Sequence, residues 1–201
     1  MKLPSIPVRI AAASALLALG LVGLVVREGV ARAGGQEVRL AITGYDPRSL
    51  LTGHYVQFQL VDNVPAEQAC RRVGERMEPL RAGWFAIRRE GTTHRIVGSA
   101  RSREAALRQG EIAVRGVAEC YGVAWTRADG REVMSPITVS LDIGVDRIHL
   151  DQDEAEALER ILQGRDGPAP PSWAVVSVGR DGEARLKGLI VGDRRVDLDW
   201  F

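Results

Sequence analysis

The feature that most constrains this chain is an uncharged, apolar run of seventeen residues, Ile10–Val26. As an α-helix this run covers about 26 Å, just enough to span a thin bilayer core. Lys2 and Arg9 precede it, so the positive-inside rule places the N-terminus in the cytoplasm. We therefore expect a cytoplasmic tail at residues 1–9, a transmembrane signal anchor at residues 10–28 and an extracytoplasmic domain at residues 34–201.

A second interpretation of the N-terminus is a cleaved signal peptide. Ala31-Arg32-Ala33 has small residues at the spacing that a signal peptidase recognises. The apolar run is longer than the usual 7–15 residues of a signal peptide, which favours the anchor. Under both interpretations the bulk of the chain is exported, so a secreted protein stays open as an alternative.

Charge beyond residue 33 is nearly balanced, with 23 basic against 25 acidic side chains. This balance gives no electrostatic reason to expect a nucleic-acid partner. The content of 45% apolar and 26% charged residues is that of an ordinary globular protein rather than a disordered one.

Periodicity after the anchor predicts a mainly β (α+β) domain. Alternating apolar residues or β-rich composition indicate strands near 38–43, 55–60, 84–88, 95–100, 112–126, 137–143, 147–150, 174–178, 185–191 and 196–200. Helical spacing predicts an amphipathic helix from residue 66 to near Gly83. Two further short helices begin at the caps Ser102 and Asp151. The expected architecture is an antiparallel, β-rich extracytoplasmic domain with two or three short helices.

The densest local signals lie between Asp46 and Leu60. Asp46 is a good N-cap, Pro47 suits the first helical position, and Gly53 can end the turn with a positive φ. A strand follows, in which Val56, Phe58 and Leu60 face one side while Gln57 and Gln59 face the other.

This segment resembles the GDYXXLXY family of bacterial membrane-anchored proteins. Gly53 and Tyr55 match the family motif, while His54, Phe58 and Leu60 stand where the motif has Asp, Leu and Tyr. Other segments that look familiar are the lead-in Asp46-Pro47-Arg48, Gly144-Val145-Asp146-Arg147, Glu154–Glu159 and Leu186–Val191. The family has no established activity. The resemblance implies a single-pass protein of the bacterial inner membrane with a periplasmic domain. It also implies a multi-pass membrane protein as partner, because such proteins tend to be encoded beside family members.

A catalytic interpretation of the motif would use His54 with Ser49 or Asp46, as a hydrolase of the cell envelope. Nucleophilic triads are recognised by geometry rather than by order, so this alternative stays open. However, the family has Asp at position 54, which argues against a histidine base there. His54, His94 and His149 also lack the spacing of metal ligands. We assign no catalytic, metal-binding or cofactor-binding residue and expect a non-catalytic domain that binds a protein partner.

The two cysteines, Cys70 and Cys120, lie on apolar faces of expected elements. In an exported domain they either form a disulfide or remain buried thiols. Their separation along the chain does not decide between these states, because pairing depends on the distance between their Cα atoms.

Overall fold

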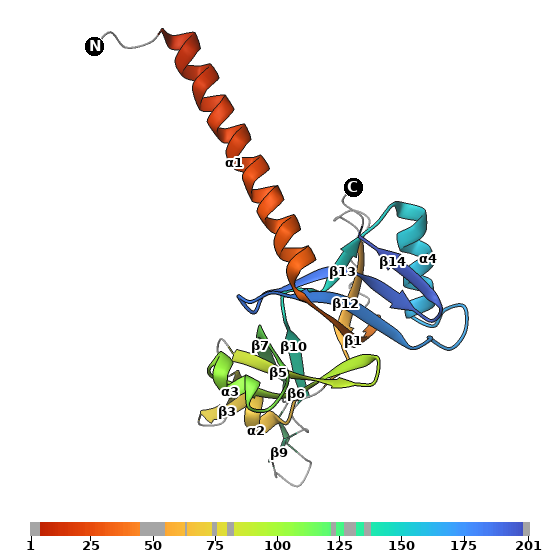
Figure 1. Cartoon of the computed structure of the whole chain (residues 1–201). Coiled ribbons are helices and arrows are strands. Elements are labelled where there is room, and N and C mark those ends of the chain that lie inside the picture. Colours follow the sequence, from red (N-terminus) through yellow and green to blue (C-terminus); the bar gives the residue numbers. More distant parts are fainter. Residues whose placement is uncertain are drawn as a thin grey trace.

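The computed structural model describes residues 5–44, 55–62, 64–73, 76–79, 83–121, 124–126, 132–134 and 138–198. A long N-terminal helix leads into a curled, β-rich domain with few short helices (Figure 1). The predicted fold class is therefore confirmed.

Helix α1 covers Ile6–Gly34 and projects away from the domain (Figure 1). Pro7 lies in its first turn, where the missing N–H costs no hydrogen bond. None of its residues is buried, and Leu16 and Leu17 are each 71% exposed. Within the described ranges, α1 is the one helix long and apolar enough to cross a membrane, judged by length and composition.

Ten strands of the described chain form one sheet. Its order is β10 (Thr138–Asp142), β7 (Ile112–Tyr121), β5 (Gly83–Glu90), β6 (Thr93–Ala100), β1 (Gln36–Gly44), β12 (Ser172–Val178), β13 (Ala184–Val191) and β14 (Arg194–Asp197). Off this path, β2 (Tyr55–Leu60) pairs with β1 and with β11 (Arg147–His149). Neighbouring strands are antiparallel except for β1 and β6.

Strand β1 joins the two halves of this sheet. Residues Gln36–Ala41 pair with β12, and the strand then pairs with β2 from Ile42 onward. On the way it meets β6 in parallel at a single position, Leu40 opposite His94. Alternation along β1 buries Val38, Leu40 and Ile42, as the sequence predicts.

The domain has one main hydrophobic core, to which both halves of the sheet contribute. Its largest fully buried side chains are Phe58, Phe85, Leu40, Ile87, Ile96, Ile148, Leu158 and Leu189. A small satellite cluster of Ala86, Ala106 and Ala113 lies where helix α3 (Arg103–Leu107) contacts β5 and β7.

Helices α3 and α4 (Gln152–Leu162) begin at the predicted caps. The Ala105 N–H donates to Ser102 Oγ at 3.2 Å, and the Glu154 N–H donates to Asp151 Oδ1 at 3.0 Å. Each cap satisfies a backbone donor that the helix itself leaves unpaired. The apolar face of α4 is buried through Ala155, Leu158 and Leu162.

The helix predicted from residue 66 to near Gly83 is wrong. Helix α2 covers only Ala66–Ala69, and Cys70 already has extended backbone angles. The chain continues as an antiparallel hairpin of β3 (Cys70–Val73) and β4 (Arg76–Pro79). Cys70 is joined by a disulfide to Cys120 on β7, with their Cα atoms 6.1 Å apart. The disulfide to a strand fifty residues further along the chain thus outweighs the local apolar spacing that favours a helix.

A second small hairpin pairs β8 (Ala124–Thr126) with β9 (Glu132–Met134). It lies apart from the main sheet, at the far side of the domain from α1 (Figure 1).

Helix α1 passes into β1 through a single residue, Gly35. A Cβ atom there would lie 2.0 Å from Ser177 Oγ, so glycine permits the close approach to β12. The last two turns of α1 also contact β13 and the residue that follows β14. Arg185 Nε lies 2.6 Å from Glu28 Oε1, and Arg32 Nη2 donates to the carbonyl oxygens of Lys187 (3.1 Å) and Leu198 (2.7 Å).

Candidate functional site

The motif singled out in the sequence is only partly described by the structure. Its turn, including Asp46, Pro47, Arg48, Gly53 and His54, lies outside the described residues, as does Ser49 of the hydrolase alternative. The strand that follows is described, and it carries the remaining motif residues Tyr55, Phe58 and Leu60.

Strand β2 separates these motif residues onto two faces. Val56 and Phe58 are each 1% exposed and belong to the main core, and Leu60 packs against that core at the end of the strand. Tyr55 and Gln57 point to the opposite face, where both are half-buried. The motif therefore supplies core packing through Phe58 and a surface aromatic ring through Tyr55.

Strand β11 completes this surface. Antiparallel pairing sets His149 opposite Tyr55 and Arg147 opposite Gln57. The ring centroids of Tyr55 and His149 are 5.9 Å apart, and the Arg147 guanidinium lies 5.3 Å from the Tyr55 centroid. His149 is thus the direct cross-strand neighbour of Tyr55, and Arg147 is its diagonal neighbour. Tyr55, Gln57, Asp146, Arg147 and His149 are called the Tyr55–Arg147 cluster below.

Asp146 orients the guanidinium of this cluster. Arg147 Nε donates to Asp146 Oδ1 at 3.0 Å and Arg147 Nη2 donates to Oδ2 at 2.7 Å. The hydrogen bond from Arg147 lowers the pKa of Asp146 below its ordinary value, so the carboxylate stays charged. The Asp146 carbonyl accepts the Phe58 N–H at 2.9 Å, which attaches the segment to β2.

The cluster combines an ion pair with an aromatic contact at the surface of the domain. The side chains of Arg147 and Asp146 are 45% and 44% exposed, so their ion pair adds little stability. What the pair does is hold a planar guanidinium over the Tyr55 ring, an arrangement with cation–π attraction. The half-buried Tyr55 ring and the exposed Arg147 guanidinium therefore lie together at the surface of the domain.

Sequence reasoning found part of this cluster and missed the rest. Tyr55 and the Asp146-Arg147 pair lie in segments that resemble the family, but nothing indicated that the two segments meet. His149 was missed as a neighbour of Tyr55. The available signal was the Arg147-Ile148-His149 alternation, in which the central residue is fully buried and both flanking side chains are exposed.

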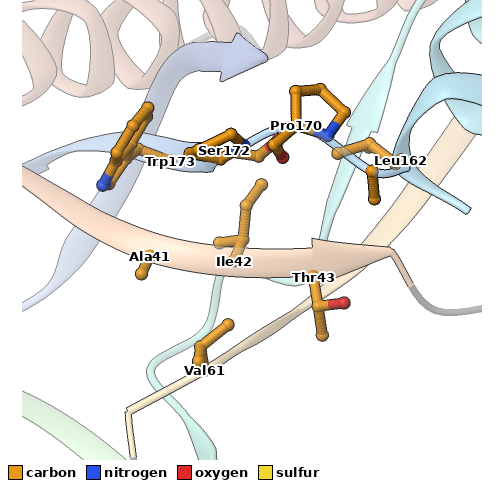
Figure 2. A pocket seen from close by; sticks show the side chains of 10 residues that line it. Ala41, Ile42, Thr43, Val61, Leu162, Pro170, Ser172 and Trp173 are labelled. Atoms are coloured by element: carbon orange, nitrogen blue, oxygen red, sulfur yellow. The ribbon is translucent and has the colours of Figure 1, made fainter. Parts of the chain in front are cut away.

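A pocket of about 380 Å³ lies elsewhere, where β1 and the start of β12 meet the loop that follows α4 (Figure 2). Its lining is mostly apolar, with Ile42 lying between Trp173 on one side and Pro170 and Leu162 on the other (Figure 2). The hydroxyl of Ser172 donates to the Pro170 carbonyl, so it is already paired. Among the described residues that line the pocket, none carries a charged side chain.

Metal binding has no geometric basis in the part of the chain that is described. No three His, Cys, Asp or Glu side chains gather there in a group that could hold an ion.

Comparison with known proteins finds a family model that matches most of the chain. The model, described as "GDYXXLXY protein", matches residues 17–189, which include the C-terminal half of α1 and most of the β-rich domain. No curated protein and no solved structure matches the chain.

Proposed function

The chain belongs to the GDYXXLXY family, and from this premise we propose that it is a non-catalytic, membrane-anchored protein whose extracytoplasmic domain binds a protein partner. The family match extends into α1, which makes the long helix part of the family pattern rather than an appendage. The proposed setting is the bacterial inner membrane, where the partner is a component of an envelope complex such as a multi-pass membrane protein.

The anchor proposal rests on α1. Residues 10–28 span the bilayer, residues 1–9 lie in the cytoplasm, and the domain from residue 34 onward lies in the periplasm. Retention of the helix is supported by its contacts, because Arg32 within Ala31-Arg32-Ala33 donates hydrogen bonds to two carbonyl groups of the domain. The disulfide between Cys70 and Cys120 supports export, since such bonds persist in oxidising compartments.

The observation that carries the binding proposal is the Tyr55–Arg147 cluster. Tyr and Arg, with Trp, are enriched among the residues that dominate the binding energy of protein interfaces. Here Arg147 is exposed and Tyr55 is half-buried. Asp146 positions Arg147 in advance, and Arg147 lies over the Tyr55 ring, so little side-chain entropy is lost on binding.

Site-specific photo-crosslinking in cells tests this proposal. A photoreactive residue in place of His149 should give a discrete protein adduct. The same residue in place of Arg108, which is exposed at the end of α3, should give none. Arg147→Ala should abolish the adduct without lowering the amount of protein. Equal adducts from positions 149 and 108, or an adduct that persists in the Arg147→Ala protein, would contradict a binding role for the cluster.

A further inference from the structure

The junction between α1 and the domain is fixed at several points. Only Gly35 separates the helix from β1, so a flexible linker is absent from this part of the described chain. Arg32 and Glu28 each contact the β-rich domain directly. The height of the domain above the bilayer therefore follows from the position of the helix.

That height is small. Glu28 is two residues beyond the apolar run that ends at Val26, or about 3 Å further along the helix axis. The polar headgroup layer adds about 5–8 Å on each side of the hydrocarbon core. Because the Arg185 guanidinium is 2.6 Å from the Glu28 carboxylate, its charged end lies at the level of the headgroups.

Arg185 also fixes the loop between β12 and β13. Its Nη2 lies 3.1 Å from Asp181 Oδ2 and 2.8 Å from Glu183 Oε2, and its side chain is only 10% exposed. The hydrogen bond from Arg185 lowers the pKa of Asp181, which keeps this carboxylate charged. One arginine thus ties the loop to the helix, and the loop lies beside the C-terminal end of α1 (Figure 1).

The far side of the same loop is attached to the rest of the domain. Arg115 N–H donates to the Gly182 carbonyl at 2.7 Å, and Gly182 packs directly on the Trp84 ring. The loop is therefore held between α1 and strands β5 and β7, and it cannot swing away from the helix without breaking these contacts.

We propose that the loop Gly179–Glu183 contacts phospholipid headgroups, so that the domain rests on the bilayer instead of being suspended above it. This inference rests on the proposed anchoring by α1. Arg27 and Arg180 are exposed and supply guanidinium donors for lipid phosphate oxygens. The charges at this junction are balanced, with three basic residues (Arg27, Arg180, Arg185) and three acidic ones (Glu28, Asp181, Glu183). The contact therefore depends on the height of the loop above the bilayer and not on the net charge of the lipid.

Depth-dependent fluorescence quenching tests the proposal in the full-length protein reconstituted into phosphatidylcholine vesicles. Single cysteines carrying a fluorophore are introduced as Leu17→Cys in the helix, Arg180→Cys in the loop and Thr92→Cys at the β5–β6 turn. A nitroxide on the acyl chain should quench position 17. A nitroxide on the headgroup should quench position 180 and leave position 92 unaffected.

A docking variant gives the matched comparison. Glu28→Ala with Arg32→Ala removes the side-chain contacts of these two residues with the domain, while Asp181 and Glu183 still pair with Arg185. Headgroup quenching at position 180 should then fall toward that at position 92, whereas Arg108→Ala, at the end of α3 and outside the junction and the loop, should leave it unchanged. If position 17 is quenched but position 180 is quenched no more than position 92, the lipid contact is refuted and the anchor stands. If position 17 is not quenched, both the anchor and the contact are refuted.

Discussion

His94 on β6 accepts the backbone N–H of Arg39 on β1 through its Nδ1, at 3.2 Å. The side chain is 7% exposed, and its Nε2 has no hydrogen-bond partner in the described structure. This contact lies at the single position where β1 and β6 pair, so one imidazole links the two halves of the sheet. Burial and the nearby charges of Arg89 and Arg39 lower the pKa of His94, and Glu111 opposes them.

The position of His94 predicts a loss of stability in mild acid. Because its pKa is below the ordinary value of 6.5, the folded protein binds the proton less readily than the unfolded chain does. The contribution to the free energy of unfolding is therefore complete above pH 6.5 and is lost as pH falls through the folded-state pKa. Protonation also removes the Nδ1 acceptor that Arg39 needs.

Urea unfolding measured from about pH 5 to about pH 8 checks this prediction. His94→Asn keeps an acceptor for the Arg39 N–H but does not titrate, so its stability should fall less in acid than that of the natural protein. His149→Asn makes the same substitution at an exposed histidine and serves as the control. An acid loss of the same size in His94→Asn and in the natural protein would show that His94 is not its source.

The disulfide should contribute strongly to stability. It closes a loop with a sequence separation of 50 residues and attaches the β3–β4 hairpin to β7. Replacing both cysteines by alanine should lower the free energy of unfolding by about 2–4 kcal/mol. A thermal scan with and without reductant measures the effect: the natural protein should lose stability on reduction, and the double alanine variant should not respond. If the thermal midpoint of the natural protein does not change on reduction, the stabilising role of the disulfide is contradicted.

Much of the local architecture could be predicted because its causes are local. The cap at Asp151 and the alternation along β2 each depend on residues only a few positions apart. The hairpin that replaces the expected helix could not be predicted, since Cys70 is held by a bond to a distant strand.

The candidate site could be predicted only in part for the same reason. Gln57 and Asp146 are 89 residues apart in the chain. They come together because Asp146 directly precedes β11, a strand of only three residues that pairs with β2. The sequence of so short a strand shows little periodicity. Its place beside β2 depends on the burial of Ile148 and on backbone pairing, which are contacts between distant parts of the chain.

Two glycines with positive φ should respond differently to substitution. Apart from its chain neighbours, no described atom lies within 4 Å of where a Cβ atom of Gly91 (φ 63°) would be, so Gly91→Ala should cost only the backbone strain of about 1–2 kcal/mol. Gly182 (φ 81°) would place a Cβ atom 2.2 Å from the Trp84 ring, so overpacking adds about 1–3 kcal/mol to that strain. Chemical denaturation of the two variants measures the difference. Equal losses would show that Trp84 moves aside easily.

Substitutions on the two faces of β2 should have different effects, with the core face affecting stability and the surface face affecting binding. Phe58 is 1% exposed, so Phe58→Ala removes a large core side chain and should cost about 3–5 kcal/mol. Gln59 is its exposed neighbour, and Gln59→Ala should be nearly neutral, within about 0.5 kcal/mol. Tyr55→Ala removes a half-buried ring whose described cross-strand contacts with His149 and Arg147 are worth about 1 kcal/mol or less.

The decisive comparison measures protein level, unfolding free energy and the crosslink from position 149 in the same three variants. Tyr55→Ala should accumulate normally yet lose the crosslink, because the ring belongs to the proposed contact surface. Phe58→Ala should lose the crosslink only in proportion to the protein lost, because its side chain lies on the core face. Gln59→Ala should keep both a normal protein level and the full crosslink. If Tyr55→Ala keeps the full crosslink at normal protein level, the Tyr55 ring is a structural residue and the binding surface lies elsewhere on the domain.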